Sequence, residues 1–217
     1  MHYVTSDIHN DNRRLRSLLR EIHFTGSDKL YILGDLFDRS LYEPDPVGVY
    51  FTVLELGHAC VAVRGNHDEW LASYLWDYCH RTERERMRMK PCPYNSFALL
   101  RERLPVVDLL TLAERIRVWS LQISVTLEGT EYLLAHAQTA PPSEQKEDDY
   151  YLLGETDNSV WMERGIEGYV SVCGHQNKGN RIWKNEIGNL YLCDCGCGYR
   201  DGRLGGLCLE TKEVYYV

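Results

Sequence analysis

Short apolar runs alternate with amphipathic segments through the first 70 residues, and this alternation constrains the fold more than any other feature of the chain. Apolar residues recur from Leu15 to Ile22 with the i, i+3, i+4, i+7 spacing of an amphipathic helix, which Asn10 or Asp11 can cap. Pro46–Leu56 is a second helical segment. Because helices that connect strands favour parallel or mixed sheets, we expect an α/β fold. The strand-like runs are His2–Ser6, Leu30–Leu33 and Ala59–Val63.

The remainder of the chain shows neither an internal repeat nor a linker, so we expect one domain over residues 1–217. A mainly helical segment is expected from Trp70 to Ala113. Strands then return in a hairpin that turns at Glu128-Gly129, and residues 181–217 indicate a β-meander. The hairpin strands are 118–127 and 132–135, a further strand covers 169–173, and 141–150 is a surface loop.

Composition excludes several classes of protein. With 217 residues, of which 44% are hydrophobic, the chain can bury a core without disulfides, and its eight cysteines are expected to be reduced thiols. No apolar stretch approaches the ~18 residues that span a bilayer, and the N-terminus carries no export signal. A net charge of −8 argues against nucleic acid as a partner. We therefore expect a cytoplasmic protein that binds neither membranes nor nucleic acid.

Polar side chains follow five of the expected strands directly. The carboxyl ends of strands in an open α/β sheet meet at one edge, where such folds place their sites. All of these side chains offer oxygen or imidazole donors, a set suited to divalent metals such as Mn, Fe or Zn. Two metals held ~3.5 to 4 Å apart share an anionic bridge, and Asp35 suits that role. The candidate ligands are Asp7, His9, Asp35, Asn66, His136 and His175.

A pair of divalent cations indicates phosphoester hydrolysis. A water molecule that bridges two cations loses a proton near neutral pH, and the same cations neutralise the oxygens of a phosphoryl group. Each candidate ligand alone is weak evidence, but the set occurs in one order along the chain, each member beside an expected strand. The sequence therefore predicts a hydrolase with a dinuclear metal centre.

These ordered motifs resemble the calcineurin-like metallophosphoesterases, and within them the phosphoprotein phosphatase branch. Many relatives have a second His where this chain has Asn177, and its absence fits that branch. The resemblance implies two mixed β-sheets that form a sandwich flanked by helices, in four layers ordered α-β-β-α. The matching segments are Ser6-Asp7-Ile8-His9-Asn10, Gly34-Asp35-Leu36-Phe37-Asp38-Arg39, Arg64-Gly65-Asn66-His67-Asp68, Leu134-Ala135-His136-Ala137, Gly174-His175, and Asp194-Cys195-Gly196 in place of the family's closing Asp-Thr-Gly.

Carried over residue by residue, the resemblance implies two divalent metal ions bridged by Asp35. Mn is the expected metal, with Fe or Zn as alternatives. The ligands would be Asp7 and His9 for one ion, and Asn66, His136 and His175 for the other.

The resemblance also assigns the groups that act on the substrate. His67 would be the general acid, oriented by Asp38, and Arg39 would hold phosphate oxygens through its planar guanidinium. Asn66 would contact the substrate as well as a metal. Arg164 is the candidate for a second arginine that binds phosphate.

Two substrate classes are compatible with the motifs. We expect phosphoserine and phosphothreonine in proteins, with dinucleoside polyphosphates as the alternative. Asp68 stands where protein phosphatases of the branch commonly have Glu, and the form Arg-Gly-Asn-His-Asp also occurs in the bis(5'-nucleosyl) tetraphosphatases. Ser6, Asn10 and Ser40 stand at usual glycine positions, so an altered loop is expected there.

Three other readings remain open at this point. The pair Cys197 and Arg203 has the Cys-x5-Arg spacing of phosphatases that use a cysteine nucleophile. Cys193, Cys195 and Cys197 would lie on one face of a strand, where they could bind a soft metal. A non-catalytic binding scaffold of the same fold should lack a metal ligand or the general acid, and none is missing here.

Overall fold

Two five-stranded sheets lie face to face in the computed structural model, which describes residues 1–40 and 42–217. The first sheet has the order β10-β9-β1-β2-β3, with β1 (His2–Thr5), β2 (Lys29–Leu33), β3 (Cys60–Val63), β9 (Gly205–Cys208) and β10 (Val214–Tyr216). The second has the order β4-β5-β6-β8-β7, with β4 (Gln122–Leu127), β5 (Thr130–Ala135), β6 (Val170–Cys173), β7 (Trp183–Lys184) and β8 (Leu190–Leu192).

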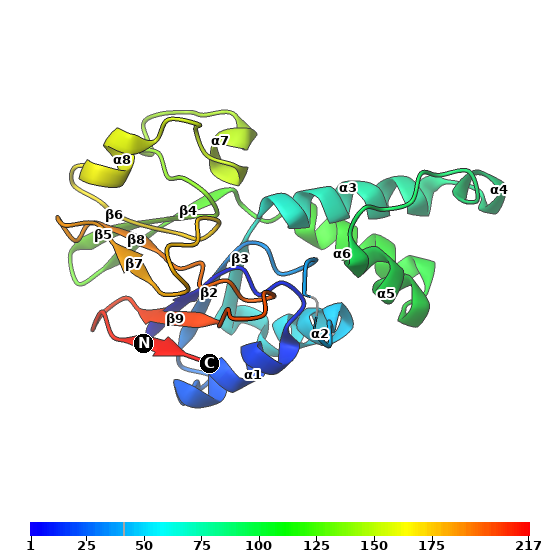
Figure 1. Ribbon diagram of the computed structural model, residues 1–217, viewed down its shortest axis with the longest axis horizontal. Helices are drawn as coiled ribbons and strands as arrows, with labels where there is room; N and C mark the ends of the chain where they lie inside the picture. Colours follow the sequence, from blue (N-terminus) through cyan, green and yellow to red (C-terminus); the bar gives the residue numbers. More distant parts are fainter. Residues whose placement is uncertain (41) are drawn as a thin grey trace.

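Helices cover both outer faces of this sandwich. Helices α1 (Asn12–Glu21) and α2 (Pro46–Leu56) lie on the outer side of the first sheet, and α7 (Asp148–Leu152) and α8 (Ser159–Arg164) lie over the second (Figure 1). The short 3-10 turn η1 (Gly57–Ala59) connects α2 to β3. Both sheets contain parallel and antiparallel pairs, so the predicted four-layer fold with two mixed sheets is confirmed.

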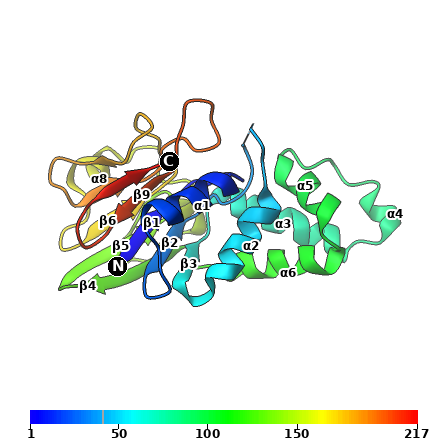
Figure 2. The same ribbon diagram turned by 90° about the horizontal axis from the view of Figure 1, so that it is seen from below.

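A helical lobe projects from one end of the sandwich (Figures 1 and 2). It consists of α3 (Asn66–His80), α4 (Glu83–Arg86), α5 (Asn95–Arg103) and α6 (Val106–Arg117), within which α3 packs along α6. The expectation of a mainly helical segment is confirmed, although the first helix begins four residues before Trp70. In the part of the chain that is described, no helix combines the length and the apolarity that crossing a lipid bilayer requires.

The helices begin where the local sequence places their caps. The Asp11 side chain accepts a hydrogen bond from the Arg14 backbone N–H at 2.9 Å and starts α1, whose Leu15 and Leu18 are buried. Asp45 caps α2 in the same way, and Pro46 occupies the first turn, where its missing N–H costs nothing. These signals are local, which is why both helices could be predicted.

The strands of the first half are parallel and their side chains fill the space between the sheets. β1, β2 and β3 pair in parallel, as do β5, β6 and β8 in the second sheet. The carboxyl ends of each set therefore lie at one edge of its sheet. Between the sheets, Val4, Leu33 and Val63 pack with Leu134 and Val172 in one apolar cluster.

The structure corrects three element predictions. Residues 181–217 do not form one meander, because β7 and β8 join the second sheet while β9 and β10 join the first. The strand expected from Val118 begins at Gln122, since Val118 is exposed and Ser120 instead forms an isolated parallel bridge with Val63. The loop expected over 141–150 runs into α7, which begins at Asp148.

Candidate metal centre

The site lies where five strand ends and their loops meet. Asp7 and His9 follow β1, Asp35 follows β2, Asn66 follows β3, His136 follows β5 and His175 follows β6. Four of these residues have left-handed backbones, with φ of 53° at Asp7, 48° at His9, 51° at Asp35 and 61° at His175. Such conformations cost about 1 to 3 kcal/mol each for a non-glycine residue and occur where surrounding structure imposes them. Here the turns point the side chains of separate strands toward one centre.

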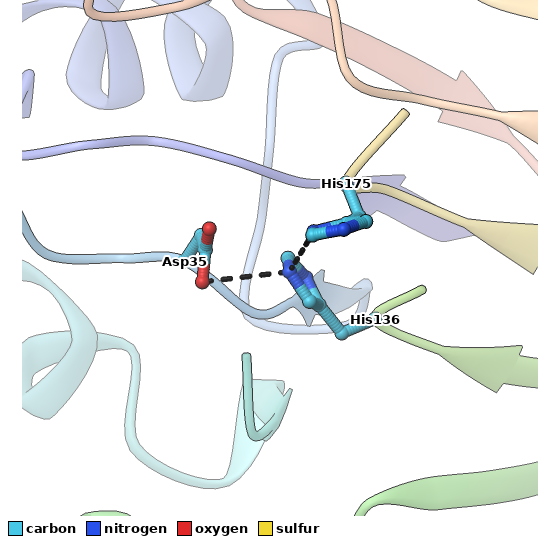
Figure 3. Close-up of side chains that lie close together, drawn as sticks. All are labelled: Asp35, His136 and His175. Carbon is cyan, nitrogen blue, oxygen red and sulfur yellow. Dashed lines mark hydrogen bonds and ion pairs between the residues drawn. The ribbon is translucent and has the colours of Figure 1, made fainter. Parts of the chain in front are cut away.

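One group of side chains gathers around His136. Its Nδ1 lies 2.7 Å from the Leu33 carbonyl oxygen and donates to it, so its Nε2 presents a lone pair. That Nε2 lies 3.2 Å from His175 Nδ1 and 3.4 Å from Asp35 Oδ1 (Figure 3). It also lies 3.0 Å from Asn66 Oδ1. Oxygen and nitrogen acceptors therefore face one another, an arrangement that a cation would satisfy.

A second group lies on the other side of Asp35. His9 donates from Nδ1 to the Phe37 carbonyl oxygen at 3.1 Å, and its Nε2 lies 3.8 Å from both Asp7 Oδ1 and Asp35 Oδ2. These two carboxylate oxygens are buried and accept no hydrogen bond from any residue that the structure describes. An unpaired buried acceptor costs about 1 to 3 kcal/mol, and more when it is charged. The unpaired oxygens thus fit a bound cation.

Asp35 belongs to both groups. The ligating atoms of Asp7, His9 and Asp35 lie within 4.8 Å of one another, and those of Asp35, His136 and His175 satisfy the same limit. Carboxylates and imidazoles of this kind suit Mn, Fe and Zn alike. All six side chains predicted as ligands, Asn66 included, are therefore brought together around Asp35.

Burial sets the charge state of the individual groups. Burial lowers the pKa of His9 to about 4, and burial together with the neighbouring His136 lowers the pKa of His175 to about 4. Neutral imidazoles are the form that binds metals. Burial, with Asp194 and Asp35 nearby, raises the pKa of Asp7 well above its usual value.

The pKa of Asp35 shifts in the opposite direction from that of Asp7. Burial alone would raise its pKa, but the nearby imidazoles of His136, His9 and His67 hold that pKa below its usual value. The residue common to both groups therefore keeps its negative charge, as a bridging ligand requires.

His67 is held beside the two groups. Its Nδ1 lies 3.4 Å from Asp38 Oδ2. Asp38 is itself fixed by Ser96, which donates its backbone N–H to Asp38 Oδ1 at 3.1 Å and accepts the Asp38 N–H on its Oγ at 2.7 Å. The Ser96 hydroxyl donates in turn to Asn10 Oδ1 at 3.0 Å. The predicted pairing of His67 with Asp38 is therefore present, and it belongs to a longer chain of hydrogen bonds.

Besides the His9 ring, whose centroid lies 5.4 Å away, two larger aromatic rings contact the His67 imidazole. The ring centroids of Trp70 and Tyr94 lie 5.0 and 4.9 Å from that of His67, both in edge-on geometry. Trp70 and Tyr94 stack on each other at 5.4 Å with an angle of 5° between their planes. These contacts restrict rotation of the imidazole, and no local sequence pattern indicated them.

The two arginines predicted to bind phosphate lie in different places. Arg39 Nη1 is 3.4 Å from His9 Nε2, and the guanidinium faces the Tyr199 ring at 5.9 Å. Arg164 is the exposed last residue of α8, and its carbonyl oxygen accepts a hydrogen bond from Asn189 Nδ2 at 2.9 Å. Among the described residues its side chain makes no hydrogen bond or ion pair with the metal-binding groups. Its assignment as a second phosphate-binding arginine stays a prediction.

Asp68 has a structural role that sequence reasoning missed. It accepts backbone N–H groups from Gly65 at 3.0 Å, Asp35 at 2.8 Å and Leu36 at 2.9 Å, and so ties the loop after β2 to the start of α3. Burial, with Asp35 nearby, raises its pKa well above the usual value. An acid three residues after a helix N-cap is the local signal that points to this role.

Gly65 must be glycine because Asp35 lies against its backbone. A Cβ at this position would stand 2.3 Å from Asp35 Oδ1 and 2.4 Å from the Asp35 backbone nitrogen. Gly65→Ala is therefore expected to displace Asp35 and to lower kcat/KM at least ~10²-fold, the cost of a misplacement of about 1 Å. Steady-state kinetics on an aryl phosphate measure this. Gly26→Ala is the matched control, because a Cβ there meets no atom within 4 Å. Equal activity of the two variants would contradict the expectation.

The cysteine alternatives fail on geometry. The Cys197 thiol is buried, donates to the Ile8 carbonyl oxygen at 3.2 Å, and has its pKa raised by burial to about 12, so it offers no thiolate. The expectation that Cys193, Cys195 and Cys197 share one strand face is wrong, because β8 ends at Leu192 and Cys193 and Cys197 pack in different apolar clusters. Within the described ranges, no group of three metal-ligating side chains includes a cysteine.

A family model described as calcineurin-like phosphoesterase matches residues 3–195. The chain belongs to the calcineurin-like phosphoesterase family, a family of metal-dependent phosphoric ester hydrolases, and the resemblance seen in the motifs is confirmed.

The curated relatives are similar over a limited segment. The symmetrical bis(5'-nucleosyl)-tetraphosphatase of Proteus mirabilis (strain HI4320) is 40% identical over 67 residues, which are 30% of this chain and 23% of the relative. The enzyme with the same description from Photorhabdus laumondii subsp. laumondii is 42% identical over 67 residues. The match thus spans 23% of the length of each of these relatives.

Solved structures share the whole fold. A crystal structure of a protein described as a candidate diadenosine tetraphosphatase has a TM-score of 0.72 and 24% identity, covering 100% of this chain and 92% of that one. A serine/threonine protein phosphatase from Saccharomyces cerevisiae has a TM-score of 0.57 and 12% identity, covering 100% of this chain and 78% of that one. At these identities the likeness shows the fold.

Proposed function

We propose that the protein is a metal-dependent phosphoester hydrolase whose substrate is a dinucleoside polyphosphate. The observation that carries the hydrolase activity is the convergence of acceptors on Asp35, with Asp7 Oδ1 and Asp35 Oδ2 buried and unpaired. The similarity to symmetrical bis(5'-nucleosyl)-tetraphosphatases supports the substrate class.

Six side chains would hold two divalent cations. Mn is the metal that we propose, and Fe and Zn suit the same donors. When bound, such cations act as Lewis acids that lower the pKa of water and neutralise charge on phosphoryl oxygens. The proposed ligands are Asp7 and His9 for one ion, Asn66, His136 and His175 for the other, and Asp35 for both.

The remaining groups bind the phosphoryl group and move a proton. The Asp38 carboxylate accepts from His67 Nδ1 and orients the ring, so His67 offers the proton on Nε2 to the leaving oxygen. Arg39 presents its planar guanidinium to phosphate oxygens, and Tyr199 supports it from one face. The amide of Asn66 lies beside His136 and can also contact the substrate.

The aromatic surroundings support a nucleotide substrate. Trp70, which is 40% exposed, contacts His67, while Tyr199, which is 51% exposed, faces Arg39. Exposed rings suit stacking with nucleobases, and a dinucleoside polyphosphate carries two of them.

A protein that carries phosphoserine or phosphothreonine is the second candidate substrate. The ordered chain from His67 through Asp38 to Ser96 favours it, because a serine alkoxide needs a proton to leave whereas a nucleoside diphosphate leaves as a stable anion.

A direct rate comparison separates the two substrates. With Mn-loaded enzyme, we expect kcat/KM for diadenosine tetraphosphate to exceed that for phosphoserine peptides on the order of 10²-fold, a difference of about 2.7 kcal/mol in transition-state binding. Faster cleavage of the phosphopeptides would establish the second candidate instead. A chain that binds less than one metal ion after loading and cleaves neither substrate would be a binding scaffold.

A further inference from the structure

A cavity of about 640 Å³ lies beside the metal-binding groups, and of its lining residues only Tyr199 has a role in the chemistry described so far. It is formed by the first turn of α1, by residues that precede α2, and by the loop between β8 and β9. Its volume is in the range of small-molecule sites. The side chains that define its character are Arg13, Arg14, Arg200, Tyr42, Tyr199 and Glu43.

We propose that this cavity binds one nucleoside diphosphate half of the substrate, namely the half that contains the attacked phosphorus. The proposal rests on the proposed function, and it assigns phosphate contacts to Arg13 and Arg200 and base stacking to Tyr42 and Tyr199.

The charge of the cavity favours an anion. Arg13 and Arg200 form no ion pair with any residue that the structure describes, whereas Arg14 pairs with Asp11 at 3.5 Å. Asp11 also lines the cavity, but its carboxylate is already occupied in capping α1. Three arginines therefore face two acids, Asp11 and Glu43, in a chain whose net charge is −8. A phosphate group is the ligand that unpaired guanidinium groups bind best.

The tyrosines supply exposed aromatic surface at the cavity. Tyr42 is 55% exposed and Tyr199 is 51% exposed, so both rings stand open at the cavity. Aromatic rings beside arginines provide the stacking and the phosphate contacts that a nucleotide requires.

The cavity adjoins the phosphate-binding groups directly. Tyr199 faces the Arg39 guanidinium at 5.9 Å, and Arg39 Nη1 lies 3.4 Å from His9 Nε2. Gly198, which also lines the cavity, lies so close to His9 that a Cβ would stand 2.9 Å from the His9 Cβ. A ligand in the cavity would therefore lie next to a phosphoryl group held by Arg39.

The proton donor indicates which half of the substrate the cavity takes. The leaving half must lie toward His67, which the proposed function places at the leaving oxygen. Besides His9, the rings that contact His67 are Trp70 and Tyr94. Neither ring lines the cavity. The half that stays with the attacked phosphorus is therefore the one that extends toward Arg13 and Arg200.

The test compares the double variant Arg13→Gln/Arg200→Gln with wild type, both as the Mn-loaded chain of 217 residues. We expect KM for diadenosine tetraphosphate to rise on the order of tenfold relative to KM for phenyl phosphate, which is too small to reach the cavity. ADP should inhibit phenyl phosphate hydrolysis on the order of tenfold less strongly in the variant, while inhibition by inorganic phosphate stays the same. Arg16→Gln/Arg117→Gln removes the same charge from exposed residues outside the cavity and is the matched control.

The outcomes separate this proposal from the proposed function. If wild type cleaves diadenosine tetraphosphate and the double variant does so with the same KM, the cavity assignment is overturned and the proposed function stands. If wild type cleaves only phenyl phosphate, the proposed function is overturned. Inhibition of phenyl phosphate hydrolysis by ADP then decides the cavity assignment. Weaker ADP inhibition in the double variant supports it, and equal inhibition, or equal weakening in the control, overturns it.

Discussion

Asp35→Asn is expected to lower kcat/KM on the order of 10⁴-fold and to reduce the metal content by at least one ion per chain. Asp35 is the only residue shared by the two ligand groups among the described residues, and the nearby imidazoles hold its pKa low so that it stays charged. Loss of that charge weakens both cation sites, and several kcal/mol of lost Lewis-acid stabilisation corresponds to about four powers of ten in rate.

The amide preserves the shape of this side chain and one of its contacts. Its oxygen can still accept the His67 backbone N–H, which donates to Asp35 Oδ1 at 3.0 Å in the native protein. Metal content after loading and kinetics on an aryl phosphate are measured together, and exposed Asp201→Asn is the control. A variant that keeps two metal ions and more than a tenth of the native rate would show that Asp35 does not bridge.

The predictable part of the site follows from local sequence. Asp7, Asp35 and Asn66 each stand just beyond a short apolar run, and strands that alternate with helices bring such positions to one edge. A motif within a few residues therefore sufficed to place these groups. His136 and His175 were candidates for the same reason, and the family resemblance supplied the division of the ligands between the two ions.

The other part depends on contacts between distant segments. Ser96 fixes Asp38 from a position 58 residues away and reaches Asn10 across 86 residues. Tyr199 meets Arg39 from a loop that no strand pattern defines. The C-terminal strands show the same limit, because alternation indicates a strand but not the sheet that it joins, and here β7 and β8 join one sheet while β9 and β10 join the other.

The fall in kcat caused by His67→Asn is expected to be larger for substrates whose leaving group needs a proton. On an alkyl phosphate, whose alkoxide is a poor leaving group, we expect kcat to fall on the order of 10³-fold, within the usual contribution of a general acid. On 4-nitrophenyl phosphate, whose phenolate leaves without protonation, the fall should be less than about tenfold.

Metal content separates this role from a structural one. His67 is in neither ligand group, so the variant should bind as much Mn as wild type. Asp38→Asn provides a graded comparison, because Asp38 only orients the His67 ring at 3.4 Å and its loss should give the same leaving-group pattern with a smaller amplitude. If His67→Asn slowed both substrates by the same factor, His67 would contribute binding or position and not a proton.

The nucleoside diphosphate that leaves from a dinucleoside polyphosphate resembles the nitrophenolate, because it also leaves without a proton. The His67→Asn variant should therefore retain most of its activity on a dinucleoside polyphosphate while losing its activity on phosphopeptides.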